Sequence, residues 1–164
     1  MNNNFIVVAD GSRARFFQLE EPALPEVEPG PNLMEVNDLV NTEKEAHGSE
    51  IWSEAKSGRN RAPTGGAHGY DDHRDSHEEE LERRFARDIA AEAMRLSEKA
   101  GSREILLVAQ KRALGFLRNE IDPLVKRGIR VKELAKDLSK LKPHEIHEHL
   151  AREKLVPRRR PPLL

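Results

Sequence analysis

The residues best suited to chemistry form a glycine- and histidine-rich stretch in mid-chain, Gly65-Gly66-Ala67-His68. Glycines have no Cβ, so their backbone can approach a ligand or a nucleic acid closely. His68 could act as a general base or a hydrogen-bond donor near neutral pH. Two adjacent glycines are a weak signal by themselves, and the same composition is typical of a solvated loop without chemistry. Both interpretations remain open from the residues alone.

Histidines and aspartates around the same stretch resemble a set of metal ligands. The set is His68, His73 and His77 with Asp71, Asp72 and Asp75. Neutral imidazole and carboxylate would suit Zn²⁺, Ni²⁺ or Mn²⁺. The spacing matches no standard site, because a helix is predicted to begin between His73 and His77. We therefore predict no metal site and no cofactor.

Two further positions carry a chemical and a structural interpretation each. His144 and His147 are one helical turn apart and could share a ligand, but the zincin motif fails because Glu148 stands where its second histidine belongs. A solvated helix face is the simpler interpretation. Asp10 follows an apolar run, as do the carboxylates that hold Mg²⁺ in ribonuclease H-like sheets, but a turn-forming role is simpler.

The cations are concentrated towards the C-terminal end. Residues 111–164 contain 15 of the 28 Lys and Arg against 7 of the 29 Asp and Glu, so residues 1–110 hold the remaining 13 against 22. This asymmetry suits RNA or another polyanion as a partner, and equally suits charge complementarity within the molecule. The candidate phosphate contacts are Arg158, Arg159 and Arg160, with Lys140, Lys142 and Arg152 nearby. A solubilising tail is the alternative.

Composition restricts the class of protein. The 164 residues include no cysteine, which excludes disulfides, thiolate metal sites and cysteine nucleophiles. The first apolar run, residues 5–9, is too short for a signal-peptide core. No stretch approaches the roughly 20 apolar residues of a membrane span. We expect a cytoplasmic protein with no membrane partner and no evident specificity for DNA.

Five segments are predicted to form strands. Residues 5–9 and 13–19 flank Asp10-Gly11, a strong turn signal, and should form an antiparallel hairpin. Residues 33–40 predict a third strand and residues 129–134 an edge strand. Residues 104–109 are almost wholly apolar, as expected of a central strand that is covered on both faces.

Helices are predicted after the third strand. Ser76 and Glu79 match a capping box, so a helix should start at Ser76 and stop at Gly101. Residues 110–119 predict a short helical turn, and Pro143 should open the last helix. The order predicts an α/β fold, a mixed sheet of about five strands with helices packed on it. We expect one domain over residues 1–155, a flexible loop over 41–76 and a disordered basic tail over 156–164.

Several segments together resemble a bacterial family, the "protein required for attachment to host cells" or host attachment family. They include Val8-Ala9-Asp10-Gly11-Ser12-Arg13-Ala14-Arg15-Phe16-Phe17, Ser57-Gly58-Arg59, Phe85-Ala86-Arg87-Asp88-Ile89-Ala90, Leu107-Val108-Ala109, Leu114-Gly115-Phe116-Leu117-Arg118 and Lys136-Asp137-Leu138-Ser139. The resemblance covers residues 5–155. No single motif decides it, but the ordered set is fairly specific.

That family is similar in turn to the middle domain of archaeal and eukaryotic peptide-chain release factors, which implies a ribonuclease H-like fold. In release factors a Gly-Gly-Gln loop, followed by a long helix, enters the peptidyl-transferase centre and helps water to cleave peptidyl-tRNA. The equivalent loop here would be Gly65-Gly66-Ala67-His68, with Ala67 in place of the glutamine. The resemblance to release factors therefore implies the fold and a role linked to RNA or the ribosome more strongly than it implies the hydrolysis reaction.

Three functions follow from the resemblance. The first is a translation-linked protein that binds the ribosome or tRNA, non-enzymatic or vestigially catalytic, with Gly65, Gly66, Ala67, Arg59 and Arg61 as contact residues. The second is a hydrolase of peptidyl-tRNA-like esters, in which His68 is catalytic and positions water. The third is a protein that host-cell attachment requires only indirectly. The sequence identifies neither the RNA partner nor the oligomeric state.

Overall fold

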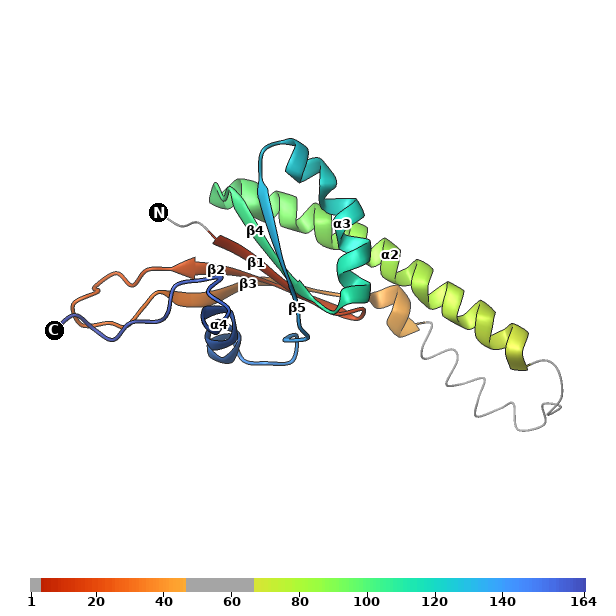
Figure 1. The fold of residues 1–164 in the computed structure, drawn as a ribbon, viewed down its shortest axis with the longest axis horizontal. Coiled ribbons are helices and arrows are strands. Elements are labelled where there is room, and N and C mark those ends of the chain that lie inside the picture. Colours follow the sequence, from red (N-terminus) through yellow and green to blue (C-terminus); the bar gives the residue numbers. More distant parts are fainter. Residues whose placement is uncertain (1–3, 47–66) are drawn as a thin grey trace.

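A mixed five-stranded sheet with helices on both faces forms the centre of the molecule (Figure 1). The computed structural model describes residues 4–46 and 67–164, with side chains from residue 76 onwards in the second range. The strands are β1 (Asn4–Ala9), β2 (Arg13–Glu20), β3 (Asn32–Val40), β4 (Glu104–Ala109) and β5 (Arg130–Ala135). The predicted α/β class and all five predicted strands are confirmed, with ends that differ by one residue or less.

The sheet has the strand order β3-β2-β1-β4-β5. β1 pairs antiparallel with β2 and parallel with β4, β2 pairs antiparallel with β3, and β4 pairs parallel with β5. β1 and β4 are buried on both faces, which explains their nearly continuous apolar sequences. The carboxyl ends of three parallel strands therefore meet at one edge, which is where ligands usually bind in open α/β sheets.

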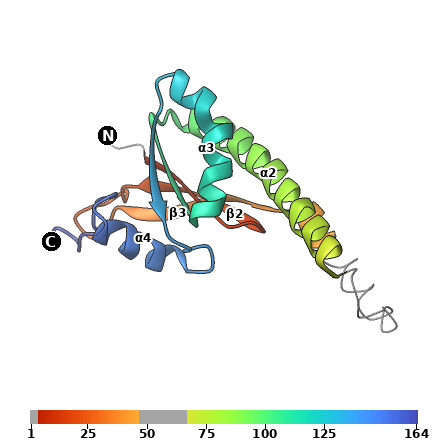
Figure 2. The same cartoon turned by 45° about the vertical axis from the view of Figure 1, so that its right-hand side comes forward.

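Alternate residues of the central strands face two separate cores. Phe5, Val7 and Ala9 face the core beneath α2 (Ala67–Ala100) and α3 (Lys111–Lys126). Ile6 and Val8 face the core beneath α4 (Pro143–Arg152). The alternation follows from the two-residue period of a strand. Figure 2 shows α2 and α3 on one side of the sheet and α4 on the other.

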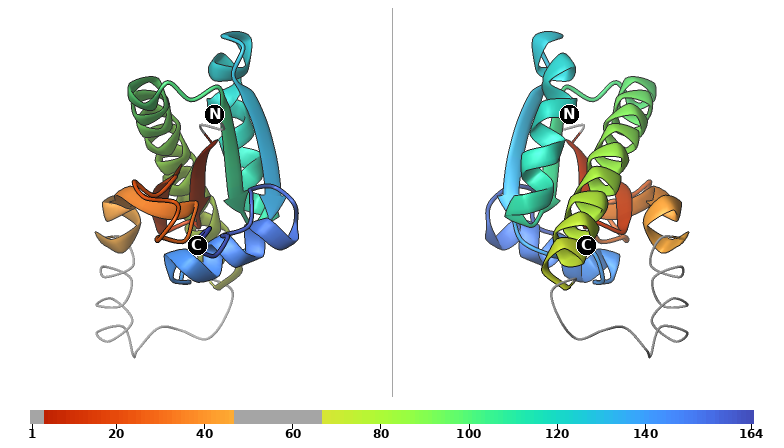
Figure 3. Two further views of the ribbon diagram at one scale, coloured as in Figure 1. Left: turned by 90° about the vertical axis from the view of Figure 1, so that its left-hand side faces the viewer. Right: turned by 90° about the vertical axis from the view of Figure 1, so that its right-hand side faces the viewer.

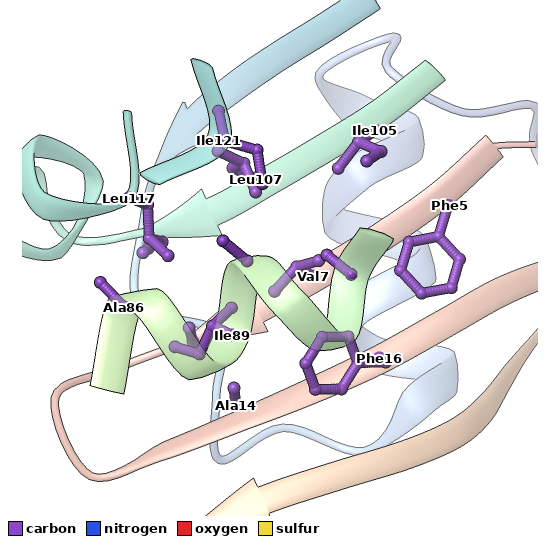
Figure 4. Close-up of a cluster of buried hydrophobic side chains, with 14 of the residues drawn as sticks. Phe5, Val7, Ala14, Phe16, Ala86, Ile89, Ile105, Leu107, Leu117 and Ile121 are labelled. Carbon is purple, nitrogen blue, oxygen red and sulfur yellow. The ribbon is translucent and has the colours of Figure 1, made fainter. Parts of the chain in front are cut away.

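The first of these cores is formed by an apolar stripe on α2 that lies across the sheet. Its buried members recur at helical spacing: Leu81, Phe85, Ala86, Ile89, Ala90, Ala93 and Leu96. Figure 4 shows Ile89 on α2, over the paired strands that carry Val7 and Ala14, and the rings of Phe5 and Phe16 have their centres 6.2 Å apart. The predicted helix stop is confirmed, since α2 ends at Ala100 and Gly101 has a φ of 67°.

The start of α2 differs from the prediction. The helix begins at Ala67, nine residues before Ser76, so residues 67–76 are not loop. Ser76 and Glu79 fit a capping box in sequence, but both lie inside a continuous helix. Residues 42–46 are helical as well, which corrects the other end of the predicted loop over 41–76. Residues 67–75 include Gly69 and three aspartates, which have low helix propensity. The local cap signal was therefore outweighed by extension of the long helix that follows it, because each residue added to an existing helix gains a hydrogen bond.

The predicted turn over residues 110–119 is the first part of a longer helix. α3 continues through Pro123 to Lys126, because its buried stripe of Leu114, Leu117, Ile121 and Leu124 continues too.

The C-terminal segment also differs from the prediction of a disordered tail. Arg160 and Gly30 exchange two backbone hydrogen bonds of 2.7 and 3.0 Å, and the amides of Leu163 and Leu164 donate to the carbonyls of Pro25 and Glu26. Residues 156–164 therefore run beside the loop that joins β2 to β3, at the end of the molecule opposite to the first turn of α2 (Figure 1), and the left view of Figure 3 is seen from this end. Over the described residues, no helix combines the length and the apolar character of a transmembrane span.

Candidate functional site

The N-terminal part of α2 projects beyond the sheet (Figure 1). Leu81 is the first buried side chain among those described on this helix, and residues 76–80 are exposed or half-buried. The 14 residues from 67 to 80 span about 20 Å at 1.5 Å per residue. Ala67, which directly follows Gly66 in the sequence, is therefore the first residue of a projecting helix.

Asn41 joins α2 to the hairpin between β1 and β2 at the point where the helix leaves the sheet. Its side-chain amide donates to the carbonyl of Gly11 at 3.2 Å and to that of Leu81 at 3.4 Å. Its backbone amide donates to the carbonyl of Ser12 at 2.8 Å. Asn41 is only 5% exposed, so its amide has little access to water as an alternative partner. The first buried turn of α2 is therefore fixed to the hairpin.

Glu82 adds an ionic contact at the same place. Its carboxylate lies 2.9 Å from Lys44 Nζ and 3.1 Å from Arg112 Nε. A Cβ on Gly11 would lie 2.6 Å from Glu82 Oε1, so the carboxylate holds this position beside the hairpin because residue 11 has no side chain. The side chain of Glu82 is 13% exposed, which weakens the screening of both ion pairs by solvent. Segments far apart in the sequence thus anchor the projecting helix.

Asp10 forms the turn between β1 and β2, in agreement with the simpler of its two predicted roles. Its Oδ1 accepts hydrogen bonds from the amides of Ser12 and Arg13, both at 2.7 Å. Its Oδ2 lies 2.8 Å from the hydroxyl of Ser139, which lies 2.7 Å from Asp137 Oδ1. Because a hydroxyl has one hydrogen, it donates to one of these carboxylates at a time. The contact joins the hairpin to the loop after β5.

Arg15 is a buried cation that fastens the same loop to the sheet. It is 7% exposed and forms a forked ion pair with Glu35 on β3, with a shortest distance of 2.6 Å. Its guanidinium also donates to the carbonyls of Ser139 and Leu141 and lies 5.1 Å from the ring centre of Phe17. A buried charge with this many partners serves to position neighbouring segments.

Sequence reasoning did not single out Arg15, Glu82 or Ser139. A signal for two of them was present, because the segments around Asp10 to Arg15 and around Asp137 to Ser139 both carry the family resemblance. The structure brings these two segments into contact. The resemblance of these two segments to the family is therefore consistent with a structural role, the anchoring of one segment to the other.

Most of the predicted loop-contact residues lie outside the described residues. These are Arg59, Arg61, Gly65 and Gly66. Ala67 and the tentative catalytic residue His68 lie in the first turn of α2, where only the backbone is described. His73 and His77 lie in the same helix, so the prediction that a helix begins between them is wrong. No group of three or more His, Asp or Glu side chains that could hold a metal occurs among the described residues.

The predicted phosphate contacts divide into two kinds. Arg159 Nε donates to Asn32 Oδ1 at 2.8 Å, and Arg160 lies 3.2 Å from the carboxylate of Glu21. Both therefore help to hold the C-terminal segment in place. Arg158 has no hydrogen-bond or ion-pair partner among the described residues. It lines two adjoining cavities of about 680 and 630 Å³.

An ion pair ties α4 to the end of β5 beside these cavities. Lys136 Nζ lies 2.7 Å from Glu153 Oε1. The hydrogen bond from Lys136 and its positive charge hold the pKa of Glu153 below its ordinary value, and His149 adds to this effect. A similar exposed pair, in which Arg118 donates to Glu133, raises the pKa of Arg118.

The comparison with known families concerns most of the chain. A family model described as "Protein required for attachment to host cells" matches residues 5–150. No curated protein matches the chain.

Proposed function

The chain belongs to the host attachment family, and we propose that it is a translation-linked protein that binds the ribosome or tRNA through the projecting end of α2. The residues proposed for this contact are Arg59, Arg61, Gly65, Gly66 and Ala67. The proposal assigns the protein to the cytoplasm, where ribosomes are, and treats it as non-enzymatic or vestigially catalytic. Its role in attachment to host cells would then be indirect, through the synthesis of other proteins.

One observation carries the proposal: α2 extends about 20 Å ahead of Leu81, the first buried side chain among those described on the helix. The described side chains ahead of Leu81, at residues 76–80, are exposed or half-buried, so they contribute little to the core. Such a projecting helix end is well placed to insert into a cavity of a larger partner. The contacts of Asn41 and Glu82 fix its base, so the direction of the projection is set by the body of the protein.

The sheet supports the release-factor comparison without deciding it. An antiparallel hairpin leads into a third strand, and the chain returns through a long helix to a parallel strand beside β1. We propose that this is the ribonuclease H-like arrangement of the release-factor middle domain. The long helix then corresponds to the one that follows the Gly-Gly-Gln loop. None of the described residues offers an observation in favour of ester hydrolysis, and no reaction is proposed.

Sedimentation of cell lysates through a sucrose gradient tests the proposal. At low salt the protein should travel with ribosomal particles, or with tRNA in the light fractions after RNase-free preparation. Substitution of Gly65→Ala together with Gly66→Ala should shift most of it to the free protein fraction. Gly115→Ala is the matched control, since a Cβ there meets no atom within 4 Å. If the wild-type protein never comigrates with either species, the proposed function is wrong.

A further inference from the structure

A basic groove lies on the opposite side of the sheet from α2, between α4 and the C-terminal segment. It consists of the two adjoining cavities, of about 680 and 630 Å³, which share Ala151, Arg152 and Arg158 in their walls. Arg159 and Arg160 also line the first cavity. Arg130, Lys132 and Lys154 line the second. Against these seven cations the walls contain two acids, Glu104 and Glu148.

Four of the cations have no acidic partner in the described part of the chain: Arg152, Lys154, Arg158 and Arg159. The others are at least partly compensated. Arg130 and Lys132 share the carboxylate of Glu104, at 3.8 and 3.2 Å, and Arg160 contacts Glu21. Like charges that crowd one concave surface raise its positive potential. A bound polyanion would relieve this repulsion.

The walls of the groove are fixed before any ligand arrives. Ile146 and Leu150 are fully buried and hold α4 on the sheet. The imidazole of His147 is 3% exposed and its Nε2 lies 2.8 Å from the carbonyl oxygen of Pro157, which accepts only, so this nitrogen is the donor. The backbone bonds between Arg160 and Gly30 hold the other wall. A preformed site loses less conformational entropy on binding.

We propose that this groove binds the sugar-phosphate backbone of single-stranded RNA. Arg152 and Arg158, which line both cavities, would contact successive phosphates, and Lys154 would extend the track. The exposed imidazole of His144, one turn before His147 on the same wall, could stack on a base. Contacts of this kind are independent of sequence and sensitive to salt.

The geometry favours RNA over a membrane surface. An interfacial helix inserts its apolar side into lipid, whereas Ile146 and Leu150 on the apolar side of α4 are buried in the core that also contains side chains of β1, β3 and β4. The groove is concave as well, which suits a strand better than a flat surface. The inference goes beyond the function proposed for α2, because none of the groove residues lies on that helix.

Fluorescence anisotropy with a labelled uridine oligonucleotide tests the groove in the purified full-length protein. We expect the variant Arg152→Gln with Arg158→Gln to bind at least tenfold more weakly at about 50 mM KCl. Its plot of log affinity against log salt should be less steep by about 1.4, the value for two lost contacts with single-stranded phosphates. The variant Arg87→Gln with Arg127→Gln removes the same charge from the α2 and α3 side and should bind like wild type.

Two results would overturn the proposal. One is equal affinity of the wild-type protein and the Arg152/Arg158 variant for the oligonucleotide, with both shown to be folded by thermal melting. The other is binding to phosphatidylserine vesicles or polyglutamate, but not to RNA, that depends on these arginines. The sucrose-gradient experiment on Gly65 and Gly66 tests a different surface of the protein. Failure of the function proposed for α2 and failure of the groove proposal can therefore be distinguished.

Discussion

The two faces of the sheet carry their positive charges differently. On the α2 and α3 side, most of the cations contact acids of their own or a neighbouring segment, and among the described residues of the two helices only Lys99 and Lys111 do not. The pairs are Arg83 with Glu79, Arg84 with Glu80 and Glu43, Arg87 with Glu120, Arg95 with Glu92, Arg112 with Glu82, Lys126 with Asp122 and Arg127 with Glu98. On the α4 side, Arg152, Lys154 and Arg158 have no such partner in the part of the chain that the structure describes.

The difference shows why net charge describes this molecule poorly. A cation 3 to 4 Å from a carboxylate has much of its field cancelled at a distance, and each such surface pair adds at most about 1 kcal/mol to stability. Unpaired cations keep their field. A chain of net charge −1 can therefore present a strongly positive groove on one face and a nearly neutral pair of helices on the other.

The largest expected effect comes from core substitutions, one on each side of the sheet. Leu150→Ala should lower the free energy of unfolding by about 3 kcal/mol, because Leu150 is fully buried beneath α4. Ile89→Ala should cost a similar amount on the α2 side. Urea denaturation measures both. At temperatures where both variants remain folded, only Leu150→Ala should weaken binding of the oligonucleotide, since it loosens one wall of the groove.

Equal RNA affinity of the two core variants would contradict this prediction. It would mean that the position of α4 does not matter for binding, and the comparison between the faces would lose its functional meaning.

Substitution of Arg15 should have the next largest effect on stability. It compares a buried ion pair with an exposed one. Arg15→Met should cost roughly 3 kcal/mol, because it leaves Glu35 and two carbonyls without their donor. Arg13→Met is matched to it on the same strand and face. Its ion pair with Asp38 is about half exposed, so the loss should stay below about 1 kcal/mol. Chemical denaturation measures the free energy of unfolding of both variants. Equal losses in the two would show that the buried ion pair contributes no more than the exposed one.

A third prediction concerns the outer wall of the groove. Gly30→Ala would place a Cβ 2.4 Å from Pro22 Cδ, so the loop before β3 must shift. We expect a loss of about 1–2 kcal/mol in stability and several-fold weaker RNA binding, because Arg160 is held by this loop. Gly115→Ala should instead be neutral or stabilising, since it replaces an uncrowded glycine within α3. Thermal melting and anisotropy measure the two effects.

The strands were predictable because their signals are local. The apolar run over 5–9 and the Asp10-Gly11 turn each indicate their structure within a few residues. The start of α2 was not, because Ser76 and Glu79 form a valid cap signal that the surrounding sequence overrides. The choice between them depends on the whole helix, not on one turn.

The candidate sites were less predictable, because they depend on contacts between distant segments. Arg158, Arg159 and Arg160 are adjacent in sequence, yet two of them are held by Asn32 and Glu21 and the third lines both cavities. Nothing in a run of three arginines distinguishes these roles. The anchor of α2 likewise requires Gly11, Asn41 and Glu82 to meet, and no periodic pattern links those positions.

The smallest expected effect tests the ion pair between Lys136, directly after β5, and Glu153, directly after α4. Because Lys136 lowers the pKa of Glu153 in the folded protein, the pair stabilises the fold above the pKa that Glu153 has in the unfolded chain. This contribution is lost as the pH falls through the lower, folded pKa. Glu153→Gln should therefore melt slightly below wild type at pH 7, and the difference should vanish well below pH 4.5. Lys136→Gln should give the same small loss, and the double variant no more than either alone, because both changes break one contact. A difference in melting temperature that persisted unchanged at pH 3 would show that Glu153 acts on α4 by some means other than its charge.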